Sequence, residues 1–257
     1  MAGRSGEARG AEGGPVAVCG MHRSGTSLFA RFLHVSGVDM GERLHVDLRT
    51  NPYGHYEDED FLTLQRQELA RAFDGEDYRV AERFEPSERF LREARALLER
   101  RSGATTRWGW KDPRTTLFLD HWLAQLPELR VVALLREPRG VLDSLARRTR
   151  STWSPRRKAH LLRVYAHHNE ELARVARRVP ERLRVVPLEP LIARPEPFLA
   201  DLSGFLDLQL DPASFRELFD PAVLDRSRRA GVLFNRAGLA RAREAHRALS
   251  ALAVRGS

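Results

Sequence analysis

A loop near the start of the chain has the residue types and spacing of a phosphate-binding site. Residues 20–27, GMHRSGTS, carry the two glycines of a Walker A motif, but Thr26 stands where that motif has its lysine. An apolar run precedes the loop and a helical pattern follows it, so the first backbone amides of the helix are available to hold a phosphate. Arg23, Ser24 and Ser27 add side-chain donors. The loop predicts a phosphorylated ligand, with a ligand-free turn as the alternative.

The missing lysine narrows the choice of ligand. In nucleoside triphosphatases this lysine contacts the β- and γ-phosphates, and an aspartate after a second strand holds Mg²⁺. Here the strand expected at residues 130–135 leads into Arg136 instead. These differences favour a ligand with a 5′-phosphate-type group, and a P-loop kinase of nucleotides or small molecules remains an alternative.

Arg136 directly follows the strand expected at residues 130–135. Pro138, which suits the first turn of a helix, follows it closely. Ser144 then lies about two turns into that helix, so both side chains can face one phosphate. A guanidinium group offers a planar, permanently charged fork for such an anion.

Together with two further segments, these residues resemble the signature of the PAPS-dependent sulfotransferases, where PAPS is 3′-phosphoadenosine 5′-phosphosulfate. Residues 23–28, RSGTSL, are similar to the 5′-phosphosulfate loop of the bacterial and Golgi members, and residues 135–144 to their 3′-phosphate motif. Residues 51–57, NPYGHYE, and 110–114, WKDPR, resemble two more stretches of the bacterial enzymes. The four motifs also occur in the order expected for the family.

The resemblance spans roughly residues 15–207 and is weaker near its end. Leu188 stands where an aromatic residue is usual, and Pro190 where an acid is usual. These departures leave open a catalytically weakened nucleotide-binding protein. Otherwise the resemblance implies an enzyme that transfers the sulfuryl group of PAPS, by in-line displacement, to a hydroxyl or amine of an unidentified small molecule, glycan or peptide.

The resemblance also implies roles for individual residues. Glu57 is the candidate base that deprotonates the acceptor, and His55 is the alternative because histidine titrates near neutrality. Lys111 is the candidate acid or leaving-group stabiliser, a task that Arg23 could share. The implied nucleotide-binding residues are Arg23, Ser24, Gly25, Thr26, Ser27, Arg136 and Ser144. No metal is expected in the reaction.

Structural roles compete with these assignments. Glu57 is alternatively a charge at a helix N-terminus, and Lys111 a salt-bridge partner of Asp112. Arg114 is a candidate for orienting the acceptor or its loop. Trp153 lies near the position where the family contacts adenine, and packing in the core explains it equally well.

Charge and cysteine content add few constraints. The 43 basic against 35 acidic residues give a net charge of +8, which fits an anionic ligand, but no nucleic-acid-binding motif is present. Cys19 is the single cysteine and is expected to be buried and inert, while His167 and His168 lack the spacing of a metal site and are interpreted as surface or packing residues. With no signal peptide or membrane-length apolar stretch, we expect a cytoplasmic protein without membrane or nucleic-acid partners. The oligomeric state stays open.

The elements that position these residues alternate along the chain. Apolar runs predict strands at residues 15–20, 107–111, 130–135 and 183–188. Helical spacing predicts helices at 24–36, 57–73, 87–101, 114–124, 156–178 and 237–253, with another from Pro138. Residues 37–55 are expected to be a loop. The pattern predicts an α/β fold: after a disordered polar tail at 1–14, one P-loop-like domain over 15–257, with a central, mostly parallel sheet of about four or five strands flanked by helices.

Overall fold

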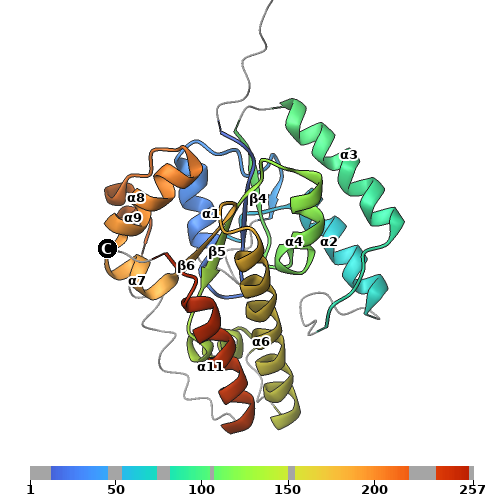
Figure 1. Cartoon of the computed structure of the whole chain (residues 1–257), viewed down its shortest axis with the longest axis vertical. Helices are drawn as coiled ribbons and strands as arrows, with labels where there is room; N and C mark the ends of the chain where they lie inside the picture. The colour runs from blue at the N-terminus through green and yellow to red at the C-terminus, as the bar shows by residue number, and fades with distance from the viewer. Residues whose placement is uncertain are drawn as a thin grey trace, which may run out of the picture.

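The centre of the computed structural model is a four-stranded parallel sheet with the strand order β4–β1–β5–β6 (Figure 1). The strands are β1 (Val16–Cys19), β4 (Gly109–Lys111), β5 (Arg130–Leu135) and β6 (Leu183–Pro187). The structure describes residues 13–45, 54–73, 82–104, 107–149, 154–219 and 236–254. The predicted α/β class and parallel sheet are confirmed.

Alternate residues of each strand face two different cores. In β1, Val16 and Val18 belong to one core, whereas Ala17 and Cys19 belong to the other. Because successive side chains of a strand point to opposite faces, and helices cover both faces, most strand positions are apolar.

One face of the sheet is covered by α1 and the helices that follow β6, which lie together in Figure 1. These helices are α1 (Thr26–Val35), α7 (Leu188–Ala193), α8 (Pro195–Leu206) and α9 (Pro212–Leu218). Phe32 of α1 meets Phe215 of α9 edge to face, with the ring centroids 5.1 Å apart. The helix after the candidate phosphate-binding loop is thus held firmly on the sheet.

The other face carries an aromatic core. Phe61 stacks on Trp110 of β4 with ring centroids 4.3 Å apart, and Trp122 packs on Trp110 at 5.4 Å. The covering helices are α2 (Glu59–Ala72), α3 (Glu88–Ala104), α4 (Thr115–Gln125) and α6 (Pro155–Arg178). This packing fixes the end of β4, where Lys111 lies.

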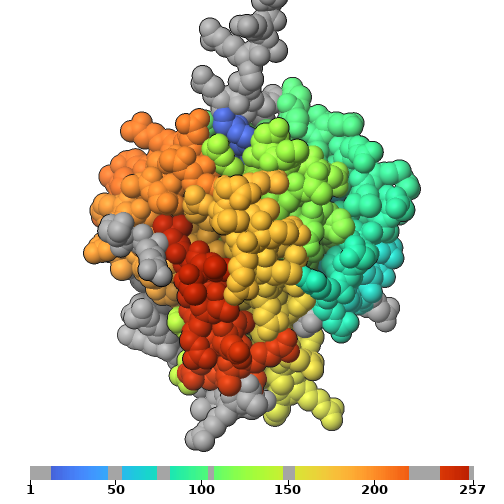
Figure 2. All heavy atoms as spheres, viewed as in Figure 1, coloured from blue at the N-terminus to red at the C-terminus, as the bar shows by residue number. Residues whose placement is uncertain are grey.

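A third group of helices packs the last part of the chain against the loop after β1. α5 (Pro138–Thr149), α6 and α11 (Arg236–Ser250) pack together, and α11 lies along α6 (Figures 1 and 2). Leu239 and Ala242 of α11 share a buried cluster with Tyr165 of α6 and with Met21. Among the described residues, no helix combines the length and apolar character needed to cross a membrane.

The structure corrects the sequence prediction in two places. Residues 37–55 were expected to be a loop and 57–73 a helix, but β2 (Leu44–His45) pairs antiparallel with β3 (Glu57–Asp58), and the helix begins only at Glu59. α1 begins at Thr26, two residues later than expected, because Arg23 and Gly25 have φ angles of 70° and 90°, which do not belong to a helix. Residues 1–12 of the predicted tail lie outside the described residues.

Candidate active site

The carboxyl ends of the four parallel strands meet at one edge of the sheet, and the predicted site residues lie there. β1 leads into the loop at residues 20–25, β4 ends at Lys111, and β5 ends just before Arg136. β6 ends just before Leu188 and Glu189. Open parallel sheets bind ligands at this edge. The topology therefore brings both phosphate motifs and Lys111 to one place.

Two glycines allow the loop at residues 20–25 to pass close to its neighbours. Gly20 has a φ of 132°, and a Cβ there would lie 2.4 Å from the carbonyl oxygen of Leu134. At Gly25, with a φ of 90°, a Cβ would lie 2.5 Å from Cδ1 of Leu188. Gly25 is the N-cap of α1 and leaves the first amides without a side-chain cap, as an anion site requires. The same turn carries the other predicted loop residues, Ser24, Thr26 and Ser27.

Arg23 connects the two predicted phosphate motifs. Its Nε donates to Oγ of Ser144 on α5 at 2.9 Å, and its backbone carbonyl accepts from Nη1 of Arg136 at 3.0 Å. Arg136 and Ser144 are both buried. The two candidate phosphate sites, separate in sequence, are thus in direct contact.

Arg136 has neighbours that the sequence analysis missed. The hydroxyl of Tyr165 on α6 donates to its carbonyl oxygen at 2.6 Å, and burial raises the pKa of this tyrosine well above its usual value. Nε of Arg136 lies 3.6 Å from Oε1 of Glu189. Nδ1 and Nε2 of His246 on α11 lie 3.1 Å from the Tyr165 hydroxyl and from Oε1 of Glu137, respectively. Glu189 directly follows a predicted strand and was therefore detectable, whereas Tyr165 and His246 depend on how α6 and α11 pack.

Lys111 and Glu57, the candidate acid and base, form a buried ion pair. Nζ of Lys111 donates to Oε1 of Glu57 at 2.7 Å and to the backbone carbonyl of His55 at 2.9 Å. Burial raises the pKa of Glu57, but the charges of Lys111 and Arg114 outweigh burial and hold it below its usual value. Glu57 is therefore ionised, as a group that accepts a proton must be.

The salt-bridge partner of Lys111 differs from the one expected, whereas Glu57 does lie beside a helix N-terminus. Lys111 does not use Asp112 as its partner; the Asp112 carboxylate instead accepts from Nη1 of Arg114 at 3.0 Å. Glu57 lies in β3 and precedes α2, whose N-cap is Asp58. Arg114 stands between the two acids and influences the pKa of each.

The other residues singled out from the sequence are buried where the structure describes them. His55 is buried beside Glu57, on whose pKa its charge acts. Cys19 is buried as expected, and burial raises the pKa of its thiol to about 12. His167 and His168 are both buried in α6, so they are not surface residues. Trp153 and residues 51–53 lie outside the described residues. Across the parts of the chain that the structure describes, no group of three or more His, Cys, Asp or Glu residues is placed to hold a metal ion.

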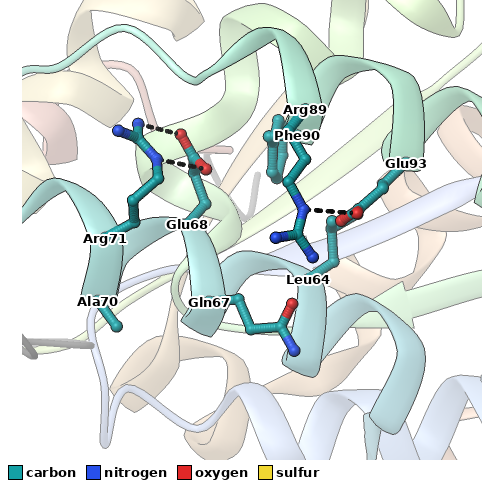
Figure 3. A pocket seen from close by; sticks show the side chains of 8 residues that line it. All are labelled: Leu64, Gln67, Glu68, Ala70, Arg71, Arg89, Phe90 and Glu93. Carbon is teal, nitrogen blue, oxygen red and sulfur yellow. Dashed lines mark hydrogen bonds and ion pairs between the residues drawn. The ribbon is translucent and has the colours of Figure 1, made fainter.

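A pocket between α2 and α3 is lined by none of the predicted site residues (Figure 3). Its volume is about 420 Å³. Its charged groups are paired with each other, Arg71 with Glu68 at 2.7 Å and Arg89 with Glu93 at 2.8 Å. We therefore give this pocket no part in the chemistry.

A comparison with known protein families identifies the family of the chain. The profile of the sulfotransferase family matches residues 15–212. The chain belongs to the sulfotransferase family. Its members are PAPS-dependent enzymes, so the resemblance drawn from the four motifs is confirmed. A search among curated proteins finds no match.

Solved structures of other sulfotransferases have a similar fold. The sulfotransferase domain of the Synechococcus PCC 7002 olefin synthase is 19% identical, with a TM-score of 0.57 over 93% of this chain and 95% of that one. The sulfotransferase domain from the curacin biosynthetic pathway is 16% identical, with a TM-score of 0.58 over 90% and 96%. The sulfotransferase from Alicyclobacillus acidocaldarius is 16% identical, with a TM-score of 0.50 over 92% of this chain and 94% of that one. At these identities the likeness establishes the fold of this sulfotransferase.

Proposed function

We propose that the chain transfers the sulfuryl group of PAPS to a hydroxyl or amine of an acceptor and releases adenosine 3′,5′-bisphosphate (PAP). The observation that carries the proposal is the contact of Arg23 with both Ser144 and Arg136. Two motifs expected to hold opposite ends of one nucleotide meet there. A buried arginine beside an uncapped helix N-terminus suits an anion with two phosphate-type groups.

Each motif would hold one end of the nucleotide. The 5′-phosphosulfate would bind the first amides of α1, with Ser24 and Thr26 as further donors, since both line the turn that leads into this helix. The 3′-phosphate would bind Arg136 and Ser144. Glu189 lies 3.6 Å from the Arg136 guanidinium, and a more highly charged phosphate would compete with it.

The transfer forms one S–O or S–N bond and breaks one S–O bond. The acceptor proton passes to the carboxylate of Glu57, the acceptor atom bonds to sulfur, and the bridging oxygen of PAPS leaves with the electron pair on PAP. Lys111 is the cation that would neutralise this oxygen. Because Lys111, Arg23 and Arg136 supply positive charge, we expect the reaction to need no metal ion.

The Lys111–Glu57 ion pair would couple these two tasks. While the pair is intact, Glu57 is ionised but is a weak base, since its pKa is low. If Lys111 turns to the leaving oxygen, Glu57 loses the largest of the charges that lower its pKa, and burial then raises that pKa. The base would strengthen as charge develops on the leaving group.

We also propose that residues 15–257 form one domain. The family match ends at residue 212, but α11 continues the same core, because Leu239 and Ala242 pack with Met21 beside the phosphate-binding loop. His246 of α11 also contacts the tyrosine that holds the Arg136 carbonyl.

The test is formation of PAP from PAPS over a panel of alcohols, amines, glycans and peptides. Glu57→Gln keeps the shape of the side chain but cannot accept the proton, so we expect kcat to fall about 100-fold or more with little change in PAPS affinity. Glu59→Gln, a more exposed carboxylate in α2, is the control. Equal losses of turnover and PAPS affinity in Glu57→Gln would make this residue structural. Failure of the wild type to form PAP with any acceptor would contradict the proposed function.

A further inference from the structure

The helix α11 lies outside the family match, yet it packs beside the candidate phosphate site. The match ends at residue 212, well before the start of α11. Leu239 and Ala242 of α11 belong to one buried cluster with Val141 of α5 and Tyr165 of α6. The last described helix thus packs on both helices that follow β5, and it lies along α6 in Figure 1.

A chain of hydrogen bonds runs from α11 to Arg136. The Tyr165 hydroxyl donates to the Arg136 carbonyl at 2.6 Å, and Nδ1 of His246 lies 3.1 Å from the same hydroxyl. Burial, followed by the charges of Glu137 and Glu189, raises the pKa of Tyr165 well above its usual value, so the hydroxyl keeps its hydrogen. Because this hydrogen goes to the carbonyl, Nδ1 of His246 is the donor to the hydroxyl oxygen.

The second ring nitrogen of His246 has partners of its own. Nε2 lies 3.1 Å from Oε1 of Glu137 and 3.4 Å from Oγ of Ser250. A ring with partners at both nitrogens has a fixed orientation. Glu137 directly follows Arg136, so the ring contacts this short segment twice, once directly and once through the Tyr165 hydroxyl.

This segment determines where the Arg136 guanidinium lies. A Cβ at Gly140, in the first turn of α5, would lie 2.9 Å from Nε of Arg136, so the side chain lies against the backbone of α5. Ser144 is on the same helix. The placement of α5 therefore sets the positions of both members of the candidate 3′-phosphate motif. Hydrogen bonds weaken steeply when their geometry is poor, so phosphate affinity depends on this placement.

We propose that His246 is a positioning residue for the 3′-phosphate of the nucleotide. Through Tyr165 and Glu137 it holds the start of α5, and with it Arg136 and Ser144, in the arrangement that binds this phosphate. The inference rests on the proposed function, in which these two residues bind the 3′-phosphate. It adds a helix beyond the family match to the nucleotide site.

The experiment measures, by calorimetry on the full chain, the affinity for PAP and for adenosine 5′-monophosphate (AMP), which lacks the 3′-phosphate. His246→Ala removes the donor to Tyr165, so we expect the dissociation constant for PAP to rise about two- to tenfold, the effect of one hydrogen bond. The affinity for AMP should not change. His246→Asn keeps an N–H group near the position of Nδ1 and should recover most of the loss.

Two further variants test the connection through the tyrosine. Tyr165→Phe removes the hydroxyl and should lower PAP affinity by a factor similar to that of His246→Ala. Because the two groups act in one chain of hydrogen bonds, the double variant should bind PAP no more weakly than either single variant. Arg247→Gln is the control, since Arg247 is the exposed neighbour of His246 on α11 and its loss removes a full charge.

The outcomes separate this inference from the proposed function. Unchanged PAP affinity in His246→Ala, an equal loss of affinity for PAP and AMP, or the same loss in Arg247→Gln overturns the positioning role and leaves the proposed function intact. Additive losses in the double variant would likewise show that His246 does not act through Tyr165. A wild type that does not bind PAP would contradict the proposed function and this inference with it.

Discussion

Replacement of Arg136 by alanine tests whether the end of β5 holds a phosphate. The buried guanidinium donates to the carbonyl of Arg23 and lies 3.6 Å from Glu189. The substitution removes this cation but keeps the backbone carbonyl of residue 136, to which Tyr165 donates. We therefore expect the chain to fold and to lose affinity for PAP.

The size of the loss follows from the contacts. One charge-assisted hydrogen bond contributes roughly 1.5–3 kcal/mol, which is about a 10- to 150-fold change in the dissociation constant. In the variant, Glu189 also loses its partner and repels the phosphate. The dissociation constant for PAP should therefore rise toward the upper part of this range.

Isothermal titration calorimetry with PAP measures the effect, and a thermal melt checks the fold. Arg139→Ala is the matched control, because Arg139 is exposed on α5 and its loss changes the net charge equally. If Arg136→Ala binds PAP as tightly as the wild type, or if Arg139→Ala weakens binding by the same factor, the local phosphate contact does not exist.

Three other measurements address the proposed chemistry. Burial raises the pKa of Glu57, but Lys111 and Arg114 outweigh it, so the acid limb of kcat/KM should lie below pH 4.5; a limb near pH ~6.5 would indicate a histidine base such as His55. Lys111→Ala should lower kcat about 100-fold and move this acid limb to higher pH, because the charge that most lowers the pKa of Glu57 is gone. An unchanged pH profile would show that Lys111 does not control the protonation of the catalytic base. The Cys19 thiol, with a pKa of about 12, should react with a disulfide reagent only after unfolding, and fast reaction of the native protein would show that the thiol is accessible.

Most of the sheet was predictable because β1, β5 and β6 are mainly apolar and lie between two helical layers. The segment from Val16 to Cys19 is buried at every position, and its helix begins directly after a small-residue turn. The β2–β3 pair was not predictable, since two residues in each strand give no period. Its pairing of Leu44 with Asp58 depends on where α2 begins.

The residues of the candidate site were easier to predict from the sequence than the ion pairs that they form with each other. Lys111 and Asp112 are adjacent in sequence, but successive side chains of an extended chain point in opposite directions. Lys111 consequently meets Glu57, 54 positions away, while Asp112 meets Arg114. No sequence pattern encodes this choice, because it depends on how β3 is placed beside the end of β4.

If the two motifs hold one nucleotide as proposed, the contacts of Arg23 imply that its two ends do not bind independently. Its side chain reaches Ser144 and its carbonyl reaches Arg136, so one residue with a φ of 70° contacts both members of the 3′-phosphate motif from within the 5′ loop. A phosphate that binds Ser144 must share or replace the Arg23 contact, and the released guanidinium then becomes available to the phosphosulfate. Because such coupling is reciprocal, a ligand at the 5′ loop that draws Arg23 away also opens Ser144 for the 3′-phosphate. A nucleotide with both groups would therefore be favoured over either half by more than the sum of the separate contacts.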